Sequence, residues 1–165
     1  MRNWTIGIGF FLVGCGGVTP MSGDYVVTST LVSGDCVMLA DEEAEEPLAS
    51  GDSMESEMTL DFQDDGSVVI GDDENTECTL KGATVTCSTA GQVDFGPELD
   101  LVLVLSGSSE YVFDSNTSFS GTSSTSMSCE GADCSVLESS EDVVVPCSSE
   151  FDIAGSMAED AASAE

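Results

Sequence analysis

The sequence predicts an all-β protein, folded as an antiparallel meander of about eight or nine strands. Apolar and polar residues alternate with a period of two in many short runs, separated by Gly, Asp and Ser. No long run has a convincing helical period, since the best candidate, residues 39–46, is short, acidic and stopped by Pro47. Most runs are joined by short loops, which favours sequential antiparallel pairing. We therefore expect a disulfide-braced up-and-down barrel or β-sandwich.

The expected strands share this alternation and are bounded by turn residues. They cover residues 24–33, 54–63, 67–71, 76–81, 84–89, 98–105, 109–114, 117–129 and 148–157. Residues 101–105 are apolar on both faces, which predicts a central strand covered by a second layer. Residues 117–128 are rich in Ser and Thr, so we expect them either at a solvated edge or lining a polar cavity.

One hairpin can be assigned a register from its turn. Gly82-Ala83 fits a two-residue type II′ turn with Gly first. This turn pairs Leu80 with Val85 and Cys78 with Cys87, and it places all four on one face. Counted from the turn, the cysteine pair is non-hydrogen-bonded, so its Cα atoms approach to about 4.5 Å, within disulfide reach. A turn one residue earlier would make the bridge diagonal.

A second hairpin surrounds Asp64-Asp65-Gly66. A two-residue turn there would mix apolar and polar residues on each face. A three-residue loop with Gly66 in the left-handed region pairs Phe62 with Val68 and Leu60 with Ile70. This register keeps the apolar residues together, and we predict it for that reason.

The charge balance excludes several classes of function. Asp and Glu number 32, Arg2 and Lys81 are the only basic residues, and His is absent, which gives a net charge of −30. Nucleic-acid binding through phosphate neutralisation is excluded because there is no basic footprint. Ser-His and Cys-His catalysis is excluded by the absence of His. With so many acidic residues, a pair of carboxylates is no specific sign of a catalytic site. We therefore predict no enzyme and no cofactor.

Calcium is the one metal that the acidic turns suggest, because it prefers hard oxygen ligands. Asp61, Asp64 and Asp65 surround one turn, and residues 72–75 form the next. Neither matches an EF-hand loop, so we expect solvated acidic loops and no metal site. The like-charge run 41–46 is expected to be a solvated loop as well.

Residues 1–14 predict a secretory signal peptide. One positive charge precedes an apolar run over 4–13, which is too short for a bilayer core that takes about 20 residues. Leu12-Val13-Gly14-Cys15 then resembles the lipobox of bacterial lipoproteins. This resemblance implies a diacylglyceryl group on Cys15, cleavage before it by signal peptidase II, and further acylation by fatty acids such as palmitate.

The same resemblance divides the chain into parts. We expect lipidated Cys15 and a flexible linker over 15–22, an all-β domain over 23–157 and a disordered acidic tail over 158–165. Gly16 stands where many Gram-negative lipoproteins that stay in the inner membrane carry Asp. The resemblance therefore implies a protein of the cell envelope, anchored in the outer membrane and either periplasmic or surface-exposed. The membrane, reached through lipidated Cys15, is the expected partner.

The cysteine count agrees with the lipobox. There are seven Cys, and lipidation of Cys15 leaves an even set that can form three disulfides in an oxidising compartment. The six are Cys36, Cys78, Cys87, Cys129, Cys134 and Cys147. In a closed meander the first and last strands are neighbours, which brings Cys36 near Cys147 and leaves Cys129 with Cys134. The alternative set, Cys134–Cys147 with Cys36–Cys129, stays open.

A weak resemblance to lipocalins adds a second hypothesis. Gly23-Asp24-Tyr25 is similar to the Gly-x-Trp that opens the lipocalin barrel, with Tyr in place of Trp, but the expected mature chain has no Arg to partner it. We predict a lipid-anchored envelope β-domain with a non-catalytic binding or structural role and an unknown partner, such as an envelope protein. The alternative is a lipocalin-like carrier of a small apolar ligand. A filled barrel would favour the first, and an empty apolar interior the second.

Overall fold

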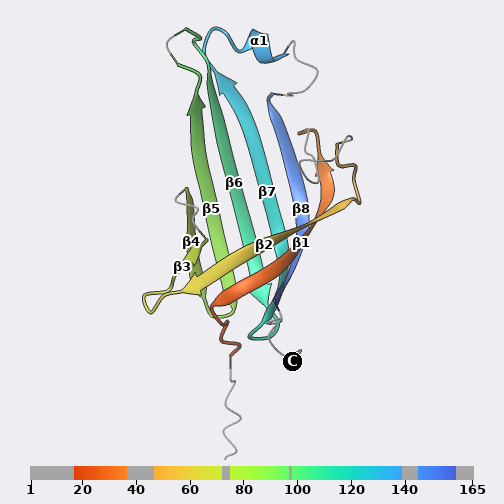
Figure 1. The fold of residues 1–165 in the computed structure, drawn as a ribbon, viewed down its shortest axis with the longest axis vertical. Helices are drawn as coiled ribbons and strands as arrows, with labels where there is room; N and C mark the ends of the chain where they lie inside the picture. Colours follow the sequence, from red (N-terminus) through yellow and green to blue (C-terminus); the bar gives the residue numbers. More distant parts are fainter. Residues whose placement is uncertain (1–16, 37–46, 72–74, 97, 139–144, 159–165) are drawn as a thin grey trace, which may run out of the picture.

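The structure is a computed structural model that describes residues 17–36, 47–71, 75–96, 98–138 and 145–158. Eight antiparallel strands close into one barrel in the order of the chain, and β8 pairs back with β1 (Figure 1). The strands are β1 Gly23–Gly34, β2 Ser53–Phe62, β3 Ser67–Ile70, β4 Thr76–Lys81, β5 Thr84–Asp94, β6 Val102–Phe113, β7 Ser118–Glu130 and β8 Cys147–Met157. The predicted all-β meander is confirmed, as a barrel and not a sandwich.

Both predicted hairpin registers are confirmed. Leu80 lies opposite Val85 across β4 and β5, and Gly82 in the turn has a φ of 67°. Phe62 lies opposite Val68 across β2 and β3, and the turn between them again contains a left-handed glycine. In both turns a glycine adopts a positive φ without steric cost, and the register keeps apolar side chains on one face.

The prediction of two separate strands over 98–105 and 109–114 is wrong, because β6 is a single strand. The residues between them, predicted as a loop, lie in mid-strand. Ser106 and Ser108 share hydrogen bonds with hydroxyls of β7, at 2.8 and 2.9 Å. A Cβ on Gly107 would lie 3.2 Å from a β7 carbonyl oxygen. Cross-strand hydroxyl pairs therefore hold a segment whose composition is typical of a loop.

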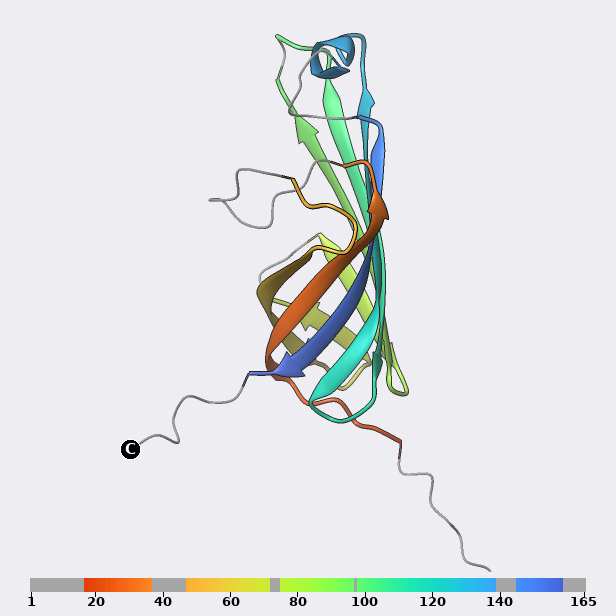
Figure 2. The same cartoon turned by 90° about the vertical axis from the view of Figure 1, so that its right-hand side faces the viewer.

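The strands differ in length, and this difference shapes the molecule. β5 to β8 contain 11 to 13 residues, whereas β3 and β4 contain 4 and 6. The long strands therefore continue beyond the closed part, which we call the lower barrel, as an open curved sheet (Figures 1 and 2). We call this extension the upper sheet: residues 90–94 of β5, 102–106 of β6, 126–130 of β7 and the start of β8.

An aromatic cluster fills the lower barrel. Tyr25 is fully buried, and its ring centroid lies 6.1 Å from that of Phe113 and 5.6 Å from that of Phe119. The ring centroid of Tyr111 lies 5.2 Å from that of Phe119, and the ring centroid of Phe62 lies 5.7 Å from that of Phe113. Rings at these separations pack as they do in a protein interior. The closed part of the barrel therefore has a packed core, with Leu60 and Val85 also fully buried.

The segment before β1 covers the closed end of the lower barrel. Val18 packs against the core. The N–H of Met21 donates to the carbonyl of Asn116 at 2.9 Å, and the hydroxyl of Tyr25 donates to the carbonyl of Met21 at 2.6 Å. Of the expected flexible linker 15–22, the part from Val18 onward is thus held against the barrel.

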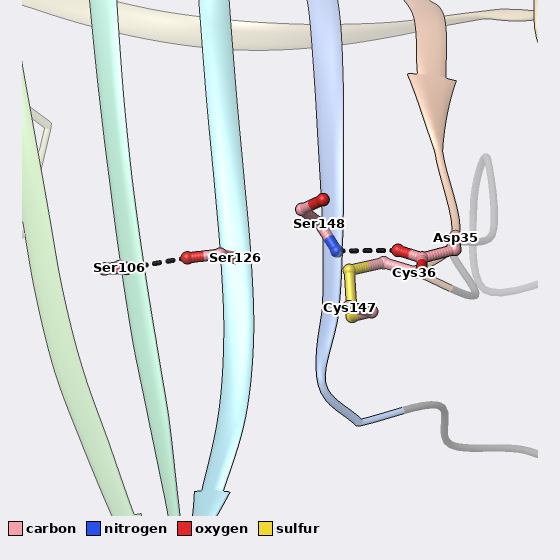
Figure 3. The surroundings of a disulfide bond; sticks show 6 residues. All are labelled: Asp35, Cys36, Ser106, Ser126, Cys147 and Ser148. Carbon is pink, nitrogen blue, oxygen red and sulfur yellow. Dashed lines mark hydrogen bonds between the residues drawn. A yellow bond between two sulfur atoms is a disulfide. The ribbon is translucent and has the colours of Figure 1, made fainter.

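The six cysteines of the β-domain form three disulfides. They are Cys36–Cys147, Cys78–Cys87 and Cys129–Cys134. The alternative set is wrong because closure of the barrel places the end of β1 beside the start of β8. Figure 3 shows this junction, where the N–H of Ser148 donates to the Asp35 carboxylate at 2.7 Å beside the disulfide.

One short helix, α1 (Ser135–Glu138), follows the Cys129–Cys134 bridge. It is a single turn at the upper end of the molecule (Figure 1). Of the helices in the described ranges, none has the length and apolar character needed to cross a membrane. The helical candidate 39–46 lies entirely outside the described residues.

Candidate functional site

The inner face of the upper sheet is apolar and exposed. Val93 lies opposite Leu103, and Leu105 lies opposite Met127. Strand alternation puts these four on the same face as the buried Tyr111, further down β6. Val93 is 47% exposed and Leu105 is 40% exposed, because the short strands of the lower barrel end before they reach this level. We call these four residues the upper apolar patch.

The tip beyond the patch is apolar too. Phe95 and Leu99, in the turn between β5 and β6, are 46% and 38% exposed, and Val136 in α1 is 53% exposed. Half of the large apolar side chains that are exposed among the described residues therefore gather at this one end. Exposed apolar side chains gathered at one end of an otherwise acidic chain indicate an interaction site.

A belt of small polar side chains separates the upper apolar patch from the aromatic core. Its members face inward from β5 to β8: Thr89, Ser109, Ser123, Thr125 and Ser149. The hydroxyl of Ser109 donates to that of Ser123 at 2.9 Å. A hollow of about 150 Å³ lies here, between the belt and Leu105. The predicted alternative of a strand lining a polar cavity fits β7, which is a central strand and not an edge.

Ser149 is the buried polar group of this belt. It is 1% exposed, and among the described residues its hydroxyl has no hydrogen-bond partner. A Cβ on Gly34 would approach this hydroxyl oxygen to 2.3 Å, so glycine is needed beside it. A buried hydroxyl without a partner costs about 1–3 kcal/mol. Ser149 is therefore a buried polar group that the described part of the chain leaves unsatisfied.

Carboxylates surround the apolar end. Asp94 and Glu130 lie in one cross-strand row on the outer face, on either side of Val102. Three more acidic residues, Glu98, Asp100 and Asp133, lie in the loops of the tip. Among the described residues the only basic side chain is Lys81, which precedes the turn at the opposite end of β5. Eleven residues of strand separate the two ends by about 35 Å.

The outer face of the long strands is polar at mid-height, between Val104 and Val112 of β6. Hydroxyls from neighbouring strands form rows, one of which, Ser106 to Ser126, is drawn in Figure 3. A shallow hollow of about 500 Å³ on this face is bordered by Glu110, Glu150 and Asp152. Most of its lining side chains carry hydroxyls or carboxylates, and only Val32 and Phe151 are apolar, so we take it as a weaker candidate for an apolar ligand than the inner face.

The described candidates for metal binding, Asp61, Asp64 and Asp65, do not form a site able to hold a metal ion. Asp65 accepts hydrogen bonds from the hydroxyl and the N–H of Ser67, at 2.7 and 2.9 Å, and these bonds hold the pKa of its carboxyl below the ordinary range. In the described part of the chain no three acidic, Cys or His side chains form a cluster able to hold a metal ion. Residues 72–74 and 41–46 lie outside that part, as do the lipidation candidate Cys15 and residues 159–165.

We compared the chain with known protein families, curated proteins and solved structures. No family model, curated protein or solved structure matches this chain. Any assignment of function therefore depends on the geometry described above.

Sequence reasoning missed the part of β5 that carries the patch. It ended this strand at residue 89, whereas β5 continues to Asp94. Gly91 and Gln92 interrupt the apolar signal, although Val93 and Phe95 continue the alternation of period two. That alternation was the available signal for the longer strand.

Proposed function

We propose that this protein is a lipid-anchored binding domain of the cell envelope, without catalytic activity, that binds its ligand on the inner face of the upper sheet. The observation that carries the proposal is the exposed upper apolar patch. It lies where the long strands extend beyond the ends of the short ones. Val93 and Leu105 stay close to half exposed there, at the end of the molecule away from residues 17–22.

Two features support the envelope location. Three disulfides are typical of exported domains. Cys15 precedes the first described residue, Gly17, by two positions, which spans no more than about 8 Å. The segment 17–22 leads into the closed end of the lower barrel (Figure 1). A lipid on Cys15 would therefore hold the closed end at the membrane and direct the upper sheet away from it.

The absence of catalysis is proposed from side-chain chemistry. The chain has no His, and the inner face presents hydroxyls and apolar groups. A hydroxyl nucleophile needs a neighbouring base, and the carboxylates closest to the patch lie in the tip loops and on the outer face.

A lipocalin-like carrier is the second candidate. An eight-strand antiparallel barrel is compatible with a lipocalin-like binding fold. The aromatic core fills the closed part, however, and the inner hollow of about 150 Å³ is smaller than the roughly 300–1,000 Å³ typical of ligand pockets. A small apolar ligand would therefore rest on the upper apolar patch.

Binding of a neutral apolar dye, N-phenyl-1-naphthylamine, tests the proposal. The protein without residues 1–15 is expected to enhance the dye's fluorescence, and Leu105→Ser to weaken binding about tenfold because it removes apolar contact area. Val112→Ser is the matched control, since Val112 lies on the outer face of the same strand and is 46% exposed. Equal effects of the two substitutions, or no dye binding, would contradict the proposed surface.

A further inference from the structure

The upper part of β5 forms an open edge of the sheet. Pairing with β4 ends at Thr76 opposite Thr89, and one further bond runs from the N–H of Ala90 to the carbonyl of Asn75 at 3.2 Å. β5 continues to Asp94. Figure 1 shows β5 as the left margin of the upper sheet, with β4 beside only its lower part.

Backbone hydrogen bonds at both ends of β5 determine which of its groups face this edge. The carbonyl of Ala83 accepts from the N–H of Phe113 at 2.8 Å, and the N–H of Phe95 donates to the carbonyl of Leu101 at 3.4 Å. Odd-numbered residues of β5 therefore bond to the β6 side. Ala90, an even-numbered residue, bonds to the β4 side. Antiparallel strands alternate in this way along their length.

This alternation directs the N–H and C=O groups of Gln92 and Asp94 toward the open side. No described residue pairs with their backbone there. Natural proteins blunt such edges with Lys, Pro or a bulge, and residues 91–94, Gly-Gln-Val-Asp, contain neither Lys nor Pro. The edge thus keeps the donors and acceptors that an added strand needs.

We propose that this edge binds an extended segment of a partner protein, which adds to β5 as a further strand and alternates apolar with basic residues. The inference rests on the proposed function, because the apolar side chains of such a segment would lie on the inner face, beside Val93 and the rest of the upper apolar patch. Backbone bonds to Gln92 and Asp94 supply affinity, and the patch selects the apolar positions.

Charge complementarity selects the other positions. On the outer face an added strand lies next to Asp94, with Glu130 in the same cross-strand row and Glu98 in the adjoining turn. No described basic residue is near, since Lys81 lies at the far end of β5. Lys or Arg side chains on the partner would face these carboxylates. A second copy is the poorer occupant, because two chains of charge −30 repel each other.

A synthetic heptapeptide of alternating Lys and Val is the probe. Its fluorescence anisotropy is measured with the full lipid-anchored protein in phosphatidylcholine nanodiscs. Gln92→Pro removes the N–H at the open edge, where proline is tolerated, and is expected to weaken binding at least about tenfold. Gln92→Ala, the matched control, keeps the N–H and is expected to bind as the unaltered protein does. A Glu-Val peptide is expected not to bind.

A second set of probes leaves the protein unaltered. One peptide is N-methylated at its Lys amides and the other at its Val amides. Only one edge of an added strand faces β5, so one peptide is expected to lose binding and the other to retain it. If both retain it, or if Gln92→Pro binds normally, strand addition is wrong.

Other outcomes overturn the inference in different ways. Equal binding of the Glu-Val peptide contradicts the charge argument. Self-association in sedimentation that Gln92→Pro abolishes identifies a second copy as the occupant. If no peptide binds while the dye still distinguishes Leu105→Ser from Val112→Ser, the inference fails and the proposed function stands. If the dye test fails as well, both fail.

Discussion

Cys36 and Cys147 are 111 residues apart in the chain, yet their Cα atoms lie 4.9 Å apart and their sulfurs are bonded. The contact exists because β8 pairs with β1 and closes the barrel. This bridge therefore links the two ends of the meander, at the junction where Gly34 lies opposite Ser149.

The long bridge is expected to matter more than the hairpin bridge. In the chain-entropy account, a loop of this length stabilises the fold by about 4–5 kcal/mol and a short hairpin loop by about 2–3 kcal/mol. Replacing Cys36 and Cys147 together by Ala should therefore lower the free energy of unfolding more than replacing Cys78 and Cys87 together. Urea unfolding measures both double variants, and the reverse order would contradict the closed topology as the source of the effect.

Glycines on the inner face test the packing of the lower barrel. A Cβ on Gly121 would lie 1.9 Å from the backbone oxygen of Glu110, whereas a Cβ on Gly91, in the upper sheet, meets nothing within 4 Å. Gly121→Ala should cost at least about 1–3 kcal/mol because the backbone must shift. Gly91→Ala is the control and should stay within about 0.5 kcal/mol. Similar unfolding free energies for the two variants would argue against this curvature of the sheet.

Because the phenol of Tyr25 is buried, we expect the protein to lose stability at alkaline pH. Burial raises the pKa of this phenol above the ordinary value of 10.0. In the unfolded chain the phenol ionises near pH 10, while in the folded protein it stays protonated to higher pH, so the folded state binds more protons in that window. The contribution of the neutral Tyr25 phenol to the free energy of unfolding is complete below pH 10. It falls as the pH rises through the pKa of the folded protein. Urea midpoints above pH 10 should fall less steeply in Tyr25→Phe, and an unchanged slope would contradict this assignment.

The lipid anchor predicts a simple biosynthetic result. Cys15→Ser should abolish incorporation of radioactive palmitate in the producing cell, because the acceptor thiol is gone. Two or more acyl chains hold a protein on a membrane stably, whereas one gives marginal binding. Gly17→Ala, whose Cβ would meet nothing within 4 Å, should incorporate label normally. Label that persists in Cys15→Ser would show that the lipobox interpretation is wrong.

Local sequence patterns predicted the parts of the fold that depend on near neighbours. The register that places Cys78 opposite Cys87 followed from one glycine turn and from the sorting of apolar residues onto one face. The pairing of Cys36 with Cys147 depends on closure of the barrel. Local patterns do not show which distant strands are neighbours, so the sequence leaves this pairing as one of two alternatives. The structure decided between them.

The candidate site escaped prediction for a related reason. The apolar stretch 101–105 predicts a strand covered by a second layer, whereas the described structure leaves Leu105 40% exposed and places Val102 and Val104 half-buried on the outer face. Exposure there results from the difference in length between β5 and β4. Because Ser, Gly and Gln within β5 and β6 resemble loop residues, the sequence pattern understated how far these strands extend.

Methyl NMR of the protein without residues 1–15, during a titration with N-phenyl-1-naphthylamine, tests the central claim most directly. Binding on the upper sheet predicts that the methyl signals of Leu103, Leu105 and Met127 shift together with one dissociation constant. The signals of Val26 and Val112, exposed on the outer face, should stay in place. Shifts confined to the outer-face valines, or to the buried core around Val85 and Leu60, would contradict the claim that the upper inner face is the binding surface.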